Sequence, residues 1–186
     1  MKRLLLFVAF MTSATLSFYM LVVPDEKTQP ADTLSMEGDG GDSTLALQGV
    51  NIQQMSGNQV SWELQARSAD YNEPRHQALL KNVTMTIQNK PKTTGPQDET
   101  PLRAESREAR VFGETGQVVL TGSVRLNQGT EIEIRGEQAE YDHAKGLVWM
   151  PGAVTIRFRD QMHDGMDLRF SIGDQRLEIR RLRVYR

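Results

Sequence analysis

The chain has 186 residues, of which 38% are hydrophobic and 25% are charged, with a formal net charge of −2. This length and composition suit one soluble domain with modest additions, and the near-neutral charge gives no argument for nucleic-acid binding. Cysteine is absent from the sequence, which excludes disulfides, catalytic thiolates and zinc sites with cysteine ligands.

The first element is an uncharged apolar run from Leu4 to Val23 that follows two basic residues. As a helix it would be roughly 30 Å long, the thickness of a bilayer's hydrocarbon core. The basic residues before it place the remainder of the chain outside the cytoplasm. A cleaved secretory signal is the alternative, since small residues between positions 13 and 17 could mark a cleavage site. Because apolar residues continue past that site, we expect residues 1–23 to be a retained anchor.

Residues 24–44 carry six acidic residues against the single Lys27 and almost nothing that could be buried, which is typical of a flexible tether. From Leu45 onward apolar and polar residues alternate, and no stretch keeps helical spacing. We therefore expect residues 45–186 to form one all-β domain of ten to fourteen short antiparallel strands, with one buried face and one wet face. The stretch 89–101, which contains three prolines, is expected to be an exposed insertion.

A short pattern returns three times within this domain. The copies read W-x-L-x-A-x-x-A-x-Y from Trp62, L-x-A-x-S-x-x-A-x-V from Leu102, and I-x-I-x-G-x-x-A-x-Y from Ile132. We interpret each copy as an alternating strand, a bend at small residues and a second strand, followed by a turn and a third strand. The repeat therefore predicts a β meander rather than a helical solenoid.

Candidate catalytic groups are few. The three histidines, His76, His143 and His163, stand beside polar or turn residues, with Asp142 and Asp164 as neighbouring carboxylates. A catalytic triad needs a histidine oriented by a carboxylate and close to a nucleophile, so exposed loop histidines are the simpler interpretation. The sequence contains no phosphate-binding glycine motif, paired metal-ligand spacing or nucleophile elbow. We expect no enzymatic activity, no catalytic residue, no metal and no cofactor.

The inward-facing side chains are candidate binding residues. An antiparallel meander must cover its apolar face by folding over on itself, and a wide jelly roll can leave an apolar trough suited to acyl chains. Aromatic residues on that face are also ordinary core residues, so both interpretations stay open for them. The candidates for the trough are Trp62, Leu64, Val83, Met85, Leu120, Ile132, Ile134, Ile156, Leu168 and Phe170.

The C-terminal run from Arg176 to Arg186 alternates arginine with apolar residues and changes parity at residues 180–181, which predicts a bulge. A terminal strand often lies at a sheet edge, where it can pair with a strand of another protein. Leu182 and Val184 are therefore candidate docking residues. A charged edge without a partner, or contact with anionic lipid headgroups, are the alternatives.

The stretch from Gly57 through Trp62 to Tyr71, with the repeats, the acidic tether and the apolar N-terminus, resembles the LptC family of lipopolysaccharide export. The resemblance covers residues 1 to about 175 and is strongest over 49–85. Its strand patterns are shared with the related LptA proteins, and the retained anchor favours LptC.

The resemblance implies a twisted antiparallel β jelly roll with an apolar groove, without enzymatic activity. It also implies a single-pass inner-membrane protein, held through residues 4–23, with most of the chain in the periplasm. Such a chain would receive lipopolysaccharide from the LptBFG ABC transporter and pass it to LptA. Family glycines important for assembly correspond to Gly57 and Gly152, which makes them docking candidates, although both are also ordinary turn or bulge glycines.

A rival interpretation is an envelope assembly or scaffold protein that binds partners by strand addition and carries no lipid. An apolar trough open along its length would favour lipid transport. A closed, fully packed sandwich would favour the scaffold.

Overall fold

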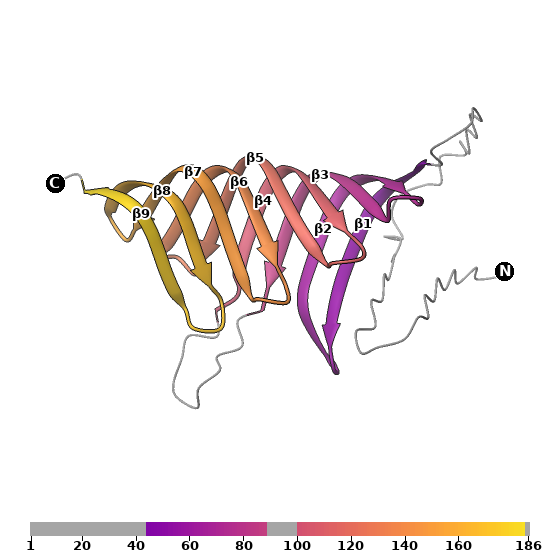
Figure 1. Ribbon diagram of the computed structural model, residues 1–186, viewed down its shortest axis with the longest axis horizontal. Coiled ribbons are helices and arrows are strands. Elements are labelled where there is room, and N and C mark those ends of the chain that lie inside the picture. Colours follow the sequence, from indigo (N-terminus) through magenta and orange to yellow (C-terminus); the bar gives the residue numbers. More distant parts are fainter. Residues whose placement is uncertain (1–43, 89–99, 185–186) are drawn as a thin grey trace.

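The computed structural model describes residues 44–88 and 100–184. These residues form a single antiparallel sheet in which the strands follow one another in sequence order (Figure 1). The strands are β1 (Thr44–Ser56), β2 (Gln59–Asn72), β3 (Gln77–Ile87), β4 (Leu102–Phe112), β5 (Gln117–Gln128), β6 (Ile132–Asp142), β7 (Leu147–Phe158), β8 (Gln161–Ser171) and β9 (Arg176–Val184).

Three segments expected from the sequence lie wholly or mostly outside the described residues. The expected anchor, residues 1–23, lies outside the described residues, as do all but the last residue of the expected tether and most of the expected insertion. No helix among the described residues is long and apolar enough to cross a membrane.

Each strand bends once near its middle. In β4, Leu102 and Ala104 are buried before the bend, and Ala109 and Val111 are buried after it, with the opposite parity. The register with β5 shifts between Glu105 and Glu108, as expected where an extra residue bends a strand. Both halves of a strand therefore face the same interior.

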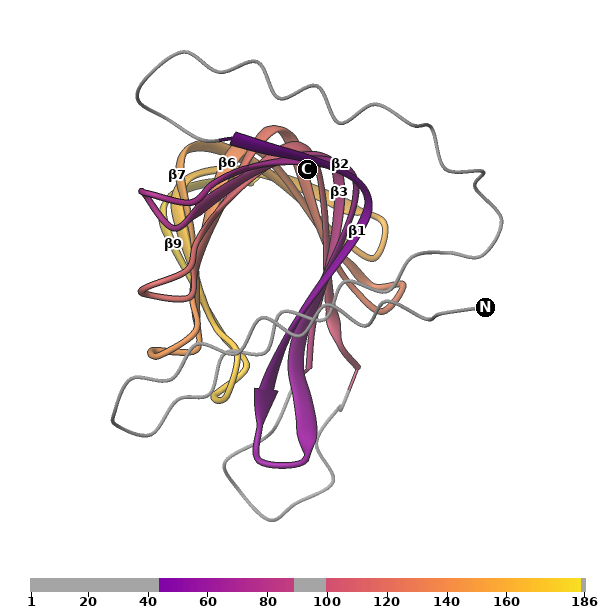
Figure 2. The ribbon, with the colours of Figure 1, turned by 90° about the vertical axis from the view of Figure 1, so that its right-hand side faces the viewer.

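The bends fold the one sheet into two facing arms that curve around a common interior (Figure 2). The first arm contains the N-terminal halves of the even-numbered strands and the C-terminal halves of the odd-numbered strands. The second arm contains the remaining halves. Inner positions are buried and outer positions are largely polar, which confirms the expected all-β domain with one dry face.

The expected number of strands was wrong. The described residues contain nine long strands rather than ten to fourteen short ones, because parity changes that suggested strand ends are bends within strands.

The three sequence copies lie on β2, β4 and β6, and their first residues share one level of the sheet. Trp62 pairs with Ile87, Ile87 with Leu102, Leu102 with Gln128, and Gln128 with Ile132.

The bends require unusual backbone conformations and small residues. The space beside Gly136 in β6 is filled by the Met150 side chain, since a Cβ atom there would lie 2.8 Å from Cε of Met150. The bulge expected near the C-terminus is confirmed, since the register of β9 with β8 shifts on both sides of Met166. Left-handed φ values occur at the bends in Asn82 (53°), Ser123 (56°), Gly152 (77°), Asp167 (52°) and Arg181 (58°).

Candidate functional site

The residues expected to line a trough all come together in the interior between the arms. Ile132 is partly buried against the core, and the others are at most 6% exposed. They come from both arms, with Ile134 on the first and Leu168 on the second. The rings of Trp62 and Tyr141 connect the arms by an edge-to-face contact, with 6.5 Å between ring centroids. The interior is thus a continuous apolar core filled by its own side chains.

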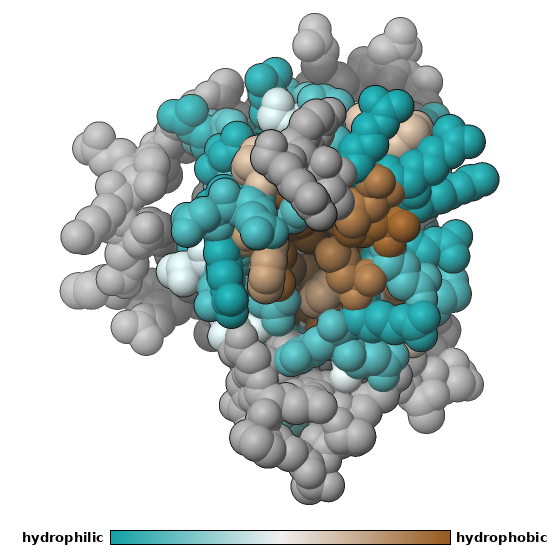
Figure 3. Space-filling model, turned by 90° about the vertical axis from the view of Figure 1, so that its left-hand side faces the viewer, coloured by the Kyte–Doolittle hydropathy of each residue, from teal (hydrophilic) through white to brown (hydrophobic). Residues whose placement is uncertain are grey.

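Apolar side chains reach the surface at the end of the sheet formed by β9, where hydrophilic residues surround them (Figure 3). On β8 and β9, Met166 is 40% exposed, Leu177 is 37% exposed and Leu182 is 49% exposed. Within the described residues β9 pairs only with β8, so its outer backbone edge has no strand partner. Strand β1 is the opposite edge and exposes 51% of Leu45.

The four candidate docking residues do not lie together. Gly57 forms the turn between β1 and β2 with φ +61°, while Gly152 lies at the bend of β7. Leu182 is exposed on β9 at the other end of the sheet, and Val184 pairs with His163 of β8. One common docking surface therefore cannot contain all four.

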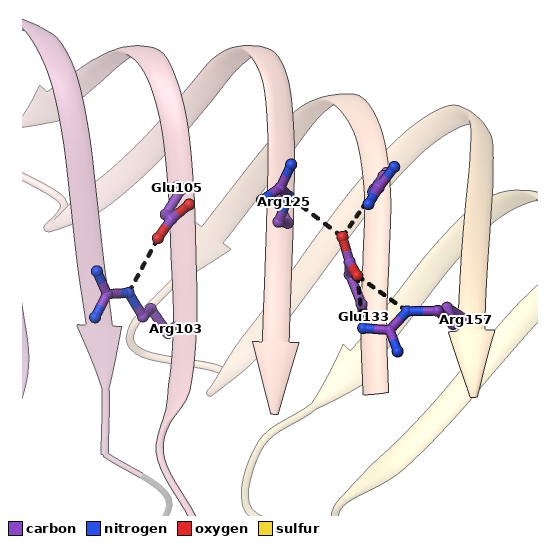
Figure 4. A network of polar contacts seen from close by, with 6 residues as sticks. Arg103, Glu105, Arg125, Glu133 and Arg157 are labelled. Carbon is purple, nitrogen blue, oxygen red and sulfur yellow. Dashed lines mark hydrogen bonds and ion pairs between the residues drawn. The ribbon is translucent and has the colours of Figure 1, made fainter. Parts of the chain in front are cut away.

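A charged network lies on the outer face of the first arm (Figure 4). Glu133 accepts hydrogen bonds from Nε of Arg135 at 2.6 Å and from Nη2 of Arg157 at 2.8 Å, and Nε of Arg125 lies 3.2 Å away. The carboxylate side chain is only 9% exposed. The hydrogen bond from Arg135, followed by that from Arg157, holds the pKa of Glu133 below its usual value. Alternation alone could not find this network, because Arg157 is distant in sequence.

The histidines match the expectation of exposed loop residues only in part: His76 and His143 lie in turns and are half-buried, whereas His163 lies in a strand. His143 is half-buried, its Nδ1 lies 3.2 Å from the Tyr141 hydroxyl, and burial lowers its pKa although the Asp142 carboxylate opposes this shift. The expectation was wrong for His163, which belongs to β8 and has a buried Nδ1 without a partner in the described residues. No group of three or more His, Cys, Asp or Glu side chains in the described ranges could hold a metal ion.

A hollow of about 520 Å³ lies at the surface near the bends of the last strands. Trp149 belongs to the outer row of the second arm, since it pairs with Glu140 and Arg169 while its neighbours Val148 and Met150 are buried. Sequence alternation gave no signal for this hollow, because three different strands contribute to it. Its lining residues are Trp149, Asp167, Arg169, Glu178, Ile179 and Arg180.

The comparison with protein families finds a match over most of the chain. The family model described as "Lipopolysaccharide-assembly, LptC-related" matches residues 14–181. This range includes all of β1 to β8 and most of β9. No curated protein matches the chain.

Proposed function

The chain belongs to the LptC-related family of lipopolysaccharide assembly, and we propose that it carries lipopolysaccharide acyl chains in the interior between its two arms. Membership gives the protein a role in lipopolysaccharide transport and associates it with the cell envelope. The family consists of transport components and is not a known enzyme family.

The observation that carries this proposal is the way in which the apolar interior is enclosed. Backbone pairing among the described strands joins only neighbours in sequence. The two arms are therefore connected through the bends, and elsewhere they meet through side chains such as Trp62 and Tyr141. Separating the arms would disturb side-chain packing but no pairing between strands. The interior can thus admit an acyl chain without loss of the sheet, and the apolar surface exposed would be covered again by the lipid.

The proposal includes a direction of transport, from the inner membrane to a periplasmic partner. We infer that the N-terminal anchor holds the chain in the inner membrane, with the folded domain in the periplasm, and that lipopolysaccharide arrives from LptBFG. The free edge of β9 and the exposed Met166, Leu177 and Leu182 suit docking of LptA by strand addition. Leu182 and Val184 are then contact residues, and Gly57 and Gly152 are further docking candidates.

A second candidate function is a scaffold that binds envelope partners at its sheet edges and carries no lipid. The packed interior favours it, because residues such as Leu64, Met85 and Leu168 are completely buried by other side chains of the chain. The free edges of β1 and β9 would be sufficient for such a role.

Mass spectrometry of lipid that co-purifies with the full-length protein distinguishes the two functions. The best matched variants are Leu64→Asn, which places an amide in the interior, and Gln65→Asn, which changes an exposed neighbour on the same strand. We expect lipopolysaccharide on the parent and on Gln65→Asn, and less of it on folded Leu64→Asn. Partner proteins captured without lipopolysaccharide on the parent would support the scaffold instead.

A further inference from the structure

Gln54 and Trp62 place hydrogen-bonding groups on the inner wall of the sheet, in β1 and β2. They are directly opposite in the register of the two strands, where opposite side chains start about 5 Å apart. Gln54 is 2% exposed and Trp62 is fully buried. Among the described residues the only other buried polar side chain is Glu133, which lies in the outer network. Gln54 is therefore exceptional on the inner wall.

The indole N–H of Trp62 is buried and has no hydrogen-bond partner among the described residues. The nearby Tyr141 ring packs edge-on against the indole, with an interplanar angle of 88°, while its hydroxyl is engaged with His143. Gln54 donates from Nε2 to the carbonyl oxygen of Met55 at 3.3 Å, so its amide group has a second N–H to offer. A buried donor without an acceptor destabilises the fold, and a phenylalanine at this position would carry no such donor.

We propose that Trp62 and Gln54 form a polar contact point in the interior that binds the ester or amide carbonyl oxygen of an acylated ligand. A carbonyl oxygen has two lone pairs, so it can accept hydrogen bonds from the indole N–H and from the Gln54 amide together. The alkyl chain lies against the apolar residues of both arms. This contact favours acyl groups over plain hydrocarbon and fixes where along the interior the carbonyl end of the chain lies. The inference rests on the proposed function, because it requires a lipid between the arms.

The two tryptophans of the chain make a direct measurement possible. Trp149 lines the outer hollow, and Trp149→Phe leaves Trp62 as the single indole. The probes are N-methyldodecanamide, which has an amide carbonyl, and tridecane, which does not, both added from cyclodextrin to the full-length protein in amphipol. We expect the amide to bind roughly three- to tenfold more tightly than tridecane, the range of one hydrogen bond. We also expect it to shift the indole emission to longer wavelength.

The decisive variant is Trp62→Phe, with binding of both probes measured by native mass spectrometry. It should reduce the preference for the amide at least twofold, because only the Gln54 amide remains to donate to the carbonyl oxygen. The matched control Phe170→Leu, which also reduces an aromatic side chain on the inner wall, should keep the preference for the amide. Equal binding of the two probes by the parent, or a preference for the amide that is undiminished in Trp62→Phe, overturns this inference and leaves the proposed function intact. Failure of both probes to bind the parent overturns the inference together with lipid binding in the interior.

Discussion

Gly152 donates its backbone N–H to the carboxylate of Asp167, with 2.9 Å between the nitrogen and Oδ1. The two residues lie at the bends of β7 and β8, and both have left-handed backbones, with φ values of 77° and 52°. The hydrogen bond therefore joins neighbouring bends at the level where the sheet folds over. Gly152 has a conformational role here, whether or not it also contacts a partner.

Gly152→Ala should destabilise the domain by about 1–2 kcal/mol, because a side chain disfavours the left-handed conformation. No atom lies within 4 Å of the added Cβ position, so steric overlap adds nothing. Urea unfolding measures this change, and Gly57→Ala, with a similar φ and similarly open space, should lose a comparable amount. Unchanged stability of Gly152→Ala with weaker partner binding would instead assign this glycine to direct docking.

Glu133→Gln should destabilise the folded state by about 1–2 kcal/mol at pH 7, since it weakens charge-assisted hydrogen bonds from partly exposed arginines. The folded-state pKa of Glu133 lies below the ordinary value of 4.5. The contribution of the Glu133 carboxylate to the stability of the fold is therefore present above pH 4.5 and is lost as the pH falls through the lower folded-state pKa.

Urea unfolding of the parent and Glu133→Gln at several pH values tests this account, and the difference between them should shrink below pH 4.5. The control is Glu105→Gln on the same outer face, where the partner Arg103 is 57% exposed. It should change stability by less than about 0.5 kcal/mol. If the difference in unfolding free energy between the parent and Glu133→Gln grew on acidification, this result would be inconsistent with the lowered pKa of Glu133.

Leu182→Asp should weaken association with LptA roughly tenfold, because a half-exposed leucine at the β9 edge would lose its burial against the partner. Leu45→Asp is the matched control, since Leu45 is 51% exposed and Leu182 is 49% exposed at opposite edges of the sheet. Both variants should keep the parent's melting temperature. Binding measured by surface plasmon resonance that falls for Leu45→Asp but not for Leu182→Asp would place LptA at the β1 edge.

The fold was largely predictable from alternation, whereas the bends that were expected to separate two strands in each copy lie within single long strands. A change in parity between Ala104 and Ala109 indicates that the chain has changed direction, but it is the same signal at a strand end and at a bend. The difference lies in the partners, since β4 pairs with β3 and β5 on both sides of this change. That information is non-local, so short strands were expected where long, bent strands occur.

The residues of the inner wall were predicted well, because the parity of a position along a strand decides whether its side chain faces inward. Contacts across the interior were not predictable in this way. Trp62 and Tyr141 belong to the first and third sequence copies and meet only because the arms face one another. Gln54 carries a polar side chain at an inward position, which weakens the alternation of β1. Its place opposite Trp62 became clear only from the register.

Photo-crosslinking in cells during active lipopolysaccharide transport tests the central claim most directly. Consecutive side chains of a strand point to opposite faces; Ile134 is 2% exposed, and the neighbouring Arg135 side chain is 58% exposed. A crosslinking residue at Ile134 should capture lipopolysaccharide and one at Arg135 should not. Leu64 and Gln65 form a second pair that leaves the Glu133 network untouched. Equal capture at inward and outward positions, or capture only at outward positions, would contradict transport through the interior.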